Sequence, residues 1–269
     1  MKLLVLTPTL GTSPYLGETL RSVAGLGAQA RHVLLCPPSV ADELRRLAPS
    51  AEIVADAEAG VYAALNRGLQ VGGEWDAFTW INDDDVLLPA GVRAAAGLLA
   101  ATAGDAVYGQ VDYFSGNGAD LGPLPVESKP ERLGALFAAG VPALTQHGTL
   151  VRRAAAEKLG WFDERYRLAA DFDYWARGLA AGWKFRPVPQ AVARYRLRPG
   201  QLSGDAAAVA AEIRASAARH FRAAPAGRGA LVRAQFRLRH LPDLGRRWRL
   251  TGCLRSSALY RLAAEENLS

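Results

Sequence analysis

The chain has 269 residues, 50% of them hydrophobic, so it is long enough to bury one large core or a core with an appendage. It contains no run of about 18 apolar residues, so we expect no membrane-spanning helix, and the apolar residues after Met1 lack the small-residue cleavage site of a signal peptide. The net charge of +6 is unevenly placed: residues 205–269 hold twelve arginines and five acidic residues, whereas residues 1–204 hold 20 basic and 21 acidic residues, so a basic tail follows a nearly neutral body.

Short apolar runs alternate with helical runs in the first half of the chain. Helices are predicted from a Ser13 N-cap with Pro14 in the first turn, from Pro37-Pro38 through Leu47, from Val61 onward, and at residues 89–101. Buried strands are predicted at residues 2–7, 32–35, 52–55, 77–81 and 106–111. Strands that alternate with helices form βαβ units, so we expect an α/β fold with a mainly parallel sheet.

Three adjacent carboxylates, Asp83, Asp84 and Asp85, follow the strand predicted at residues 77–81. Like charges at one strand end repel, and a divalent cation with oxygen ligands would relieve that repulsion. In open α/β sheets, ligands bind beyond the carboxyl ends of the strands. The alternative is a solvated acidic turn with a helix-capping aspartate, and the carboxylates alone leave both open.

The second half begins with residues 115–128, whose glycine, proline and serine content predicts a mobile loop over the site. A helix that starts near Leu168 carries Asp171 and Asp173 at its positive end, where carboxylates are favoured. The other predicted elements are helices at 130–139 and 153–159 and strands at 149–151, 184–188 and 192–197.

Seven sequence motifs follow one another over roughly residues 2 to 200. They are residues 7–9 (TPT), 15–23 (YLGETLRSV), 60–68 (GVYAALNRG), 82–86 (NDDDV), 146–147 (QH), 160–166 (GWFDERY), and 169–175 (AADFDYW) with 191–196 (AVARYR). Their order resembles the family 2 glycosyltransferases of the GT-A fold, in particular the bacterial branch that builds surface polysaccharides. Each motif is weak alone, and their shared order carries the resemblance.

The resemblance implies a GT-A (nucleotide-diphospho-sugar transferase) fold, with a mainly parallel central sheet flanked by helices and a C-terminal helical extension. Residues 1–204 would be the catalytic domain, with a nucleotide-binding half (1–111) and an acceptor-binding half (112–204), and residues 205–269 the basic extension. It also implies an inverting, metal-dependent transferase of the hexosyltransferase type. Such an enzyme transfers a sugar from a nucleotide-diphosphate donor to an acceptor hydroxyl, in cell-surface polysaccharide or glycolipid synthesis.

The resemblance assigns the chemistry to two acidic places. Mn²⁺ or Mg²⁺ would bind Asp84 and Asp85, with Asp85 the more direct ligand and Asp83 nearby, and would stabilise the departing diphosphate. The family's general base sits in an acidic dyad at a helix start, which falls on Asp171 here. Since the first position of that dyad is Ala170, any help from a second acid must come from Asp173 or be absent.

The donor contacts follow the same resemblance with one departure. The family usually reads the nucleobase with an aspartate after the second strand, where this chain has Cys36. The base could instead be read by the backbone of Thr7 to Thr9 or by Asp56 and Asn66. His147 is either a diphosphate or metal contact or a buried core histidine with its own partners, and Tyr62 and Asn66 could simply belong to an amphipathic helix. The expected donor-binding set is Thr7, Pro8, Thr9, Asp56, Tyr62, Asn66, Asp83, Asp84 and His147.

The basic tail predicts helices at residues 206–224 and 229–262, in which leucine, phenylalanine and tryptophan are interleaved with arginine. This pattern favours an interfacial helix on anionic lipid, which would suit a saccharide acceptor carried on a lipid. The alternative is a pair of helices packed on the catalytic domain with solvated arginines. Nucleic acid is not expected, because no recognition fold accompanies the charge. Cys36 and Cys253 lie far apart in the sequence and predict no disulfide framework, so we expect a cytoplasmic protein. If the tail binds lipid, the protein would be peripheral on the inner face of the plasma membrane.

Other functions remain open at this point. A sugar nucleotidyltransferase would need a glycine-rich basic loop after the first strand, but residues 7–13 hold one glycine and no lysine or arginine. A non-catalytic nucleotide-sugar binder of the same fold is kept open by Ala170 and Cys36. A dehydrogenase is disfavoured because no G-x-G-x-x-G follows a strand. The sugar, the nucleotide, the acceptor and the oligomeric state are not predicted.

Overall fold

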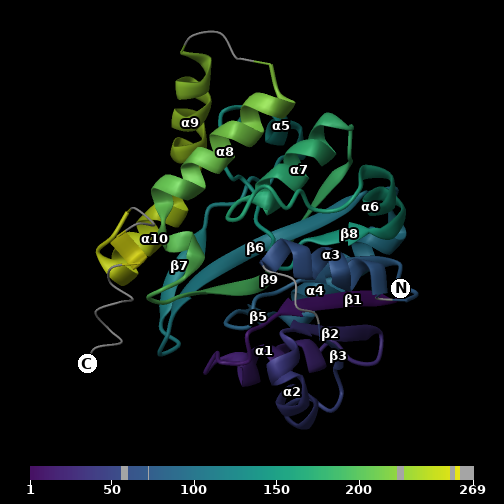
Figure 1. Ribbon diagram of the computed structural model, residues 1–269. Helices are drawn as coiled ribbons and strands as arrows, with labels where there is room; N and C mark the ends of the chain where they lie inside the picture. The colour runs from purple at the N-terminus through teal and green to yellow at the C-terminus, as the bar shows by residue number, and fades with distance from the viewer. Residues whose placement is uncertain (56–59, 72, 223–226, 255–257, 261–269) are drawn as a thin grey trace.

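The computed structural model describes residues 1–55, 60–71, 73–222, 227–254 and 258–260 (Figure 1). The strands are β1 (Leu3–Pro8), β2 (Ala30–Cys36), β3 (Glu52–Ala55), β4 (Ala77–Trp80), β5 (Val86–Leu87), β6 (Ala106–Ser115), β7 (Asp120–Leu124), β8 (Leu150–Arg152) and β9 (Phe185–Leu197). The helices are α1 (Leu16–Ala24), α2 (Ala41–Leu47), α3 (Val61–Val71), α4 (Pro89–Ala101), α5 (Leu133–Ala138), α6 (Arg153–Leu159), α7 (Ala170–Ala180), α8 (Ala206–His220), α9 (Arg228–Arg239) and α10 (Leu241–Thr251). Short 3₁₀ turns lie at Pro38–Val40, Pro130–Arg132 and Leu202–Gly204.

The strands form one sheet in the order β3-β2-β1-β4-β8-β6-β9-β5, with β7 paired to β6 off this path. The first half is parallel, since β1 pairs with β2 and β4, and β2 pairs with β3. In the second half β6 and β9 are parallel, whereas β8, β7 and β5 join antiparallel. The predicted α/β fold with helices flanking a central sheet is therefore confirmed, with its parallel strands concentrated in the first half.

Both faces of the sheet are buried, which explains why the strands read as continuous apolar runs. Successive side chains of a strand point to opposite faces. Leu4 and Leu6 of β1 therefore pack in one core with residues of α3 and α7, while Leu3 and Val5 pack in a second core with residues of α1 and α4. The loops at the carboxyl ends of β1 and β4 are left to build a site between these layers.

The prediction of a mobile loop at residues 115–128 is wrong, because much of this segment forms a β-hairpin. β6 continues to Ser115, and β7 returns antiparallel beside it, tied by the Gln110 Nε2 donating to the Leu124 carbonyl at 2.8 Å. Gly118, at φ +92°, lies in the tight turn between the two strands. The glycines that suggested a loop thus mark the turn of a hairpin.

Two further element boundaries differ from the predicted ones. The strands expected at residues 184–188 and 192–197 are one long strand, β9, whose pairing with β6 is irregular around Gln110. The helix expected at 229–262 is broken at His240 into α9 and α10. Pro242 lies in the first turn of α10, where a backbone N–H has no partner within the helix and is not needed. Inside a continuous helix the same proline would remove a hydrogen bond, so α9 ends before it.

The three C-terminal helices pack on the second half of the chain. In Figure 1, α8 runs diagonally above α7, and α9 and α10 lie along the left side. α8 packs on α7, α9 on α5, and α10 on β7. The Arg247 side chain of α10 is buried, and its Nη2 donates to the Pro123 carbonyl at 2.5 Å. The tail therefore contributes to the core of the second half of the chain.

Candidate active site

The acidic segment lies where β1 and β4 end side by side. Because these strands are parallel, with Leu6 opposite Trp80, the loops that follow them meet at the same edge of the sheet. Thr9 Oγ1 donates to Asp83 Oδ2 at 2.5 Å, and Ser13 Oγ donates to the Asp83 carbonyl at 3.0 Å. The first loop of the chain thus holds the first of the three aspartates.

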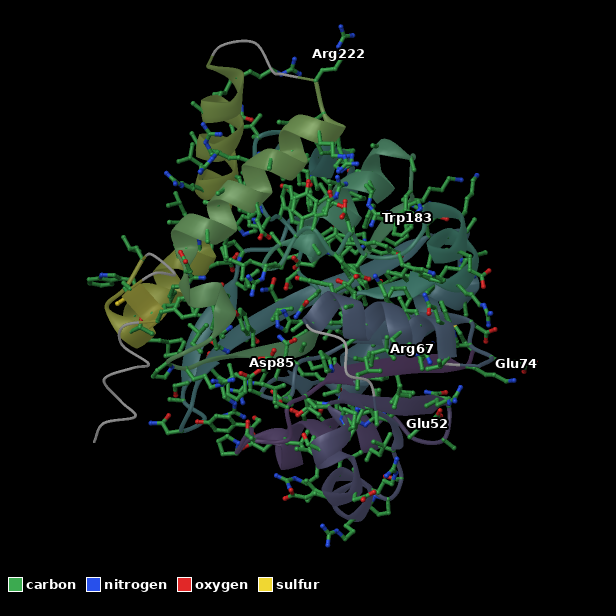
Figure 2. The ribbon with its side chains drawn as sticks, viewed as in Figure 1. Glu52, Arg67, Glu74, Asp85, Trp183 and Arg222 are labelled. Carbon is green, nitrogen blue, oxygen red and sulfur yellow. The ribbon has the colours of Figure 1, made fainter. Side chains whose placement is uncertain are left out.

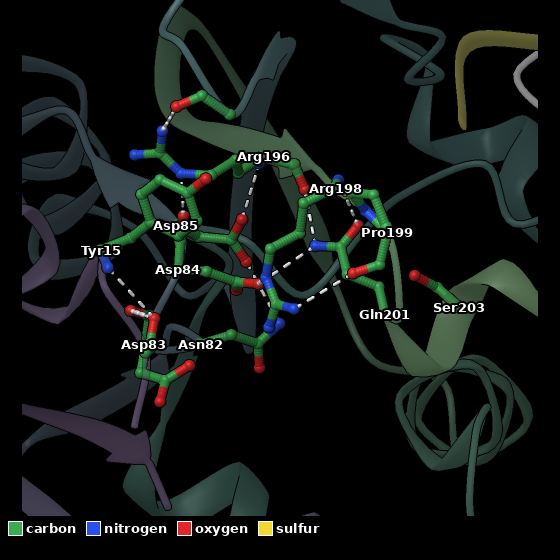
Figure 3. Close-up of polar contacts among 12 residues, drawn as sticks. Tyr15, Asn82, Asp83, Asp84, Asp85, Arg196, Arg198, Pro199, Gln201 and Ser203 are labelled. Atoms are coloured by element: carbon green, nitrogen blue, oxygen red, sulfur yellow. Dashed lines mark hydrogen bonds and ion pairs between the residues drawn. The ribbon is translucent and has the colours of Figure 1, made fainter. Parts of the chain in front are cut away.

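The end of β9 brings two arginines to the same place (Figure 3). β5 pairs antiparallel with β9, so the residues after β9 run past those before β5. The Arg196 backbone N–H donates to Asp85 Oδ1 at 2.8 Å, and the Arg196 Nε donates to the Asp84 carbonyl at 2.7 Å. Arg198 Nε and Gln201 Nε2 both donate to Asp84 Oδ2, at 2.6 and 3.2 Å.

Asp85 is fully buried and lies in the middle of the molecule, whereas Glu52, Glu74 and Arg222 lie at its periphery (Figure 2). Its Oδ2 receives the Asn82 Nδ2 at 3.1 Å and contacts His147 Nε2 at 3.0 Å. The other ring nitrogen of His147, Nδ1, bonds to Thr145 Oγ1 at 2.6 Å, and the ring stacks on that of Tyr195. His147 is thus a buried histidine with partners on both nitrogens, and it contacts the acidic cluster directly.

The electrostatics of the strand end balance carboxylates against arginines. Burial raises the pKa of the Asp83 and Asp84 carboxyls, and the charge of Asp85 raises that of Asp84 further, while Arg198 opposes the shift. The buried Arg196 guanidinium lies 4.0 Å from the Tyr15 ring centre and donates from Nη2 to Glu18 Oε2 at 2.7 Å. Part of the charge relief expected from a metal ion is supplied here by the protein's own cations.

The residues fit a divalent ion by chemistry, because carboxylate oxygens are the ligands that Mg²⁺ and Mn²⁺ prefer. Asp84 retains one oxygen, Oδ1, that accepts no hydrogen bond from the described residues. Within the described ranges, however, no three His, Cys, Asp or Glu side chains converge into a metal-binding group. An ion at Asp84 would therefore compete with the Arg198 guanidinium for the same carboxylate.

The candidate base lies across His147 from this cluster. Asp171 is the second residue of α7 and is half-buried, and Tyr62 Oη donates to its Oδ1 at 3.5 Å. Burial raises the pKa of Asp171, and the nearby His147 opposes that shift. His147 bonds to Asp85, and its charge also acts on Asp171, so this histidine lies near both acidic places. A raised pKa suits a carboxylate that must take a proton near neutral pH.

Asp173 turns away from this site toward the C-terminal extension. It is fully buried, and its carboxylate accepts from Arg177 Nε at 2.9 Å, from Ser216 Oγ at 3.0 Å and contacts His220 Nε2 at 2.8 Å. These partners place it in the packing of α7 on α8. With Ala170 at the first dyad position, help for the base had to come from Asp173 or be absent, and the geometry does not support help from Asp173.

Four other expected donor contacts are more dispersed. Thr7 is buried within β1 and bonds through Oγ1 to His32 Nε2 at 3.0 Å, and Pro8 ends that strand. Asn66 uses its whole amide on the 162–164 loop, donating to the Phe162 carbonyl and accepting from the Phe162 N–H. Asp56 lies outside the described residues.

Cys36 is also buried, and burial raises the pKa of its thiol. It ends β2 and packs with residues of α1 and α2. The motifs assign no role to three other polar residues at or near the site, Arg198, Gln201 and Glu212. Arg198 and Gln201 had a sequence signal, because Arg198 follows Arg196 at the end of the last strand, whereas Glu212 is recognisable only as the lone acid of an alanine-rich helix.

Comparison with known proteins identifies the fold. No protein-family model and no curated protein sequence matches the chain. Among solved structures it is similar to TarS from S. aureus with UDP-GlcNAc, with a TM-score of 0.62 and 16% identity, covering 98% of this chain and 79% of that one. It spans 43% of a longer TarS chain, at a TM-score of 0.61 and 16% identity, covering 89% of this chain. It is also similar to the mannosyltransferase PcManGT from Pyrobaculum calidifontis with GDP-Man and Mn²⁺, with a TM-score of 0.62 and 17% identity, covering 100% of this chain and 81% of that one. The chain has the GT-A-type fold of these proteins.

Proposed function

We propose that this protein is an inverting glycosyltransferase that moves a sugar from a nucleotide-diphosphate donor to an acceptor hydroxyl, in the synthesis of a cell-surface polysaccharide or glycolipid. The observation that carries the proposal is the pair of acidic places, Asp83 to Asp85 and Asp171, with His147 bonded to Asp85 and close enough to act on Asp171. The structures of TarS with UDP-GlcNAc and of PcManGT with GDP-Man support a nucleotide-sugar donor.

In this reaction the Asp171 carboxylate takes the proton of the acceptor hydroxyl while its oxygen bonds to the anomeric carbon. The bond from that carbon to the phosphate oxygen breaks, and the nucleoside diphosphate leaves from the opposite side of the sugar. Tyr62, whose hydroxyl donates to Asp171, orients the carboxylate. Activity should fall as the pH drops through the raised pKa of Asp171, because protonated Asp171 cannot accept the proton.

The departing diphosphate carries the developing negative charge. Arg198 lies on the Asp84 carboxylate and is partly exposed, so it can reach an incoming phosphate. Asp84 and Asp85 would hold Mn²⁺ or Mg²⁺, which supplies Lewis-acid stabilisation of that diphosphate when bound. Thr9 and Asp83 border the donor side, and Thr7, Pro8, Tyr62, Asn66, His147 and Asp56 complete the proposed donor-binding set.

The proposed organisation is a catalytic unit of residues 1–204, with a nucleotide-binding half (1–111) and an acceptor-binding half (112–204), followed by the basic helical extension 205–269. A non-catalytic nucleotide-sugar binder of the same fold remains the second candidate. The saturation of Asp85 by protein hydrogen bonds favours it, and donor binding without transfer would identify it.

The deciding experiment compares Asp171→Asn with the wild type and with Asp42→Asn, a change of an exposed aspartate on α2. A thermal-shift screen of nucleotide diphosphates and their sugars, with and without Mn²⁺, first identifies the donor. Release of the nucleoside diphosphate to an acceptor panel is then measured. We expect Asp171→Asn to bind donor normally but to lose transfer by about 10²–10⁴-fold, whereas near-wild-type transfer would remove Asp171 as the base.

We also propose that the extension contacts an anionic membrane, on its cytoplasmic face, through residues 229–262, part of which lies outside the described ranges. No helix among the described residues is long and apolar enough to cross a bilayer. Among the described residues, six of the nine exposed large apolar residues nevertheless lie on α9, on α10 or three residues beyond it: Leu231, Leu238, Leu241, Trp248, Leu250 and Leu254. Exposed arginines such as Arg228, Arg237 and Arg249 lie between them, which is the pattern of a helix at an anionic interface.

Vesicle binding tests this contact. The wild type should sediment with vesicles containing phosphatidylglycerol and less with pure phosphatidylcholine, and the double change Leu238→Ser and Trp248→Ser should abolish the difference. Leu47→Ser on α2 is the matched control, because Leu47 is 55% exposed and Trp248 is 56% exposed. Equal sedimentation of wild type and double variant would leave the tail as packed helices with solvated arginines.

A further inference from the structure

The C-terminal extension places one carboxylate directly in front of the helix that carries the candidate base. Glu212 of α8 accepts three successive backbone N–H groups: Arg167 donates to Oε1 at 3.1 Å, and Leu168 and Ala169 donate to Oε2 at 2.8 Å each. These residues lead immediately into α7, of which Asp171 is the second residue.

This contact holds the backbone just before α7, where the segment has no side-chain cap of its own. The N-cap residue of α7 is Ala169, and no side chain from its own segment accepts a hydrogen bond there. Half-buried N–H groups before a helix need acceptors, and a carboxylate is favoured at the positive end of a helix. Glu212 meets both needs from an element more than forty residues away in the chain.

Two other side chains of the same helix pack α8 on α7. Ser216 and His220 follow Glu212 at i+4 and i+8, so the three side chains lie on one face of α8. Ser216 and His220 contact the Asp173 carboxylate, two residues beyond Asp171. The face of α8 therefore holds the backbone before Asp171 and the side chain after it. The charge of Glu212 also reaches the Tyr62 hydroxyl, where it raises the pKa, so Glu212 lies close to the Tyr62–Asp171 pair.

We propose that Glu212 is a positioning residue for catalysis: the extension helix α8 fixes the segment 167–169 and thereby the place of the Asp171 carboxylate beneath the acceptor. The inference rests on the proposed function, because it takes Asp171 as the base. The family's acidic dyad has alanine, Ala170, at its first position here, and the inference gives the supporting role of that missing acid to the extension. The second carboxylate near the base comes from the tail, and it acts on the backbone.

The test compares Glu212→Ala and Glu212→Gln with Arg214→Ala, a change of an exposed residue on the same helix. For each full-length variant we would measure kcat, the donor KM, the melting temperature and the pH dependence of kcat. Glu212→Ala should lower kcat by about 10–100-fold, because small misplacements of a reacting group cost about that much. The donor KM should stay within about twofold, because donor contacts come from the other half of the site.

The pH profile separates positioning from general weakening of the fold. The groups that act on Asp171 are Tyr62 from α3, His147 from the loop before β8 and the backbone N–H groups of Phe172 and Asp171. Burial raises the pKa of Asp171, so water admitted by the loosened segment should lower that pKa and move the acid limb of kcat to lower pH. Glu212→Gln keeps one acceptor oxygen and should recover part of kcat relative to Glu212→Ala.

Two results would overturn the inference: an unchanged kcat in folded Glu212→Ala, or a loss of kcat that matches the unfolded fraction with no shift of the acid limb. Asp171→Asn measured in parallel separates this failure from failure of the proposed function. Inactive Asp171→Asn beside fully active Glu212→Ala removes only the positioning role. Active Asp171→Asn removes the base itself and with it the proposed mechanism.

Discussion

Replacement of Asp173 by alanine should destabilise the protein strongly without touching the reaction. The Asp173 side chain is 1% exposed, and it accepts from Arg177, Ser216 and His220. The change therefore leaves a cation, a buried hydroxyl and an imidazole without their common acceptor. Removing one partner of a buried ion pair typically costs about 3–5 kcal/mol.

The structure sets the expected loss in the lower part of that range. Arg177 is 20% exposed on its side chain and keeps two carbonyl acceptors, Leu159 and Trp161, so water and backbone compensate part of its charge. Buried Ser216 adds about 1 kcal/mol as an unsatisfied hydroxyl. We therefore expect the free energy of unfolding to fall by about 3–4 kcal/mol, which is about 6–16 °C in melting temperature for a chain of this size.

Urea and thermal unfolding of Asp173→Ala, Asp173→Asn and Asp42→Ala measure this directly. Asp173→Asn retains one acceptor oxygen and should lose less, and Asp42→Ala, which breaks an exposed pair with Arg45, should cost less than about 0.5 kcal/mol. The kcat of the folded fraction should stay at the wild-type value in Asp173→Asn. A loss below about 1 kcal/mol in Asp173→Ala, or a collapse of kcat at an unchanged melting temperature, would refute the assignment of Asp173 to helix packing.

Three further predictions concern the rest of the molecule. Gly91→Ala would place a Cβ 1.9 Å from the Ala191 carbonyl oxygen and should cost about 1–3 kcal/mol in unfolding free energy, whereas Gly97→Ala on the same helix meets nothing within 4 Å and should gain up to about 1 kcal/mol. Burial lowers the pKa of His32 to about 4. The unfolded chain then takes up that proton first, so the stability from neutral His32 is complete above about pH 6.5 and up to about 3 kcal/mol is lost as pH falls to 4; urea unfolding of His32→Gln should lack this part of the pH dependence. A matching nucleotide diphosphate with Mn²⁺ should raise the wild-type melting temperature by about 5 °C or more, and an equal rise in Asp85→Ala would count against the metal assignment.

Local pattern was sufficient to predict much of the fold. Strands buried on both faces have a continuous apolar signature, which predicted β1, β3 and β4 closely, and Pro89 fixed the start of α4. The acidic strand end was also recognisable, because Asp83 to Asp85 have no packing reason to be adjacent. Such signals lie within a few residues of the element they describe.

The contacts that neutralise and position those acids were not predictable from local pattern. Arg198 and Asp84 are 114 residues apart, and only the antiparallel register of β5 on β9 brings them together. The acceptor for the N–H groups of residues 167–169, just before α7, is Glu212, and no pattern near Ala169 predicts it. The hairpin of β6 and β7 was missed because Gly118 gives the same compositional signal in a tight turn as in a long loop.

The shared face of α8 has a consequence for how the chain can be shortened. A protein truncated at residue 204, where the composition turns basic, would expose the apolar surface that Ile213 and Ala217 cover. It would also leave the three backbone N–H groups of residues 167–169 without their acceptor, Glu212. One truncated after His220 would keep all of these contacts. The smallest autonomous unit should therefore include α8, and removal of α9 and α10 would in turn uncover the β7 surface on which the buried Arg247 packs and the core surface that Phe236 covers.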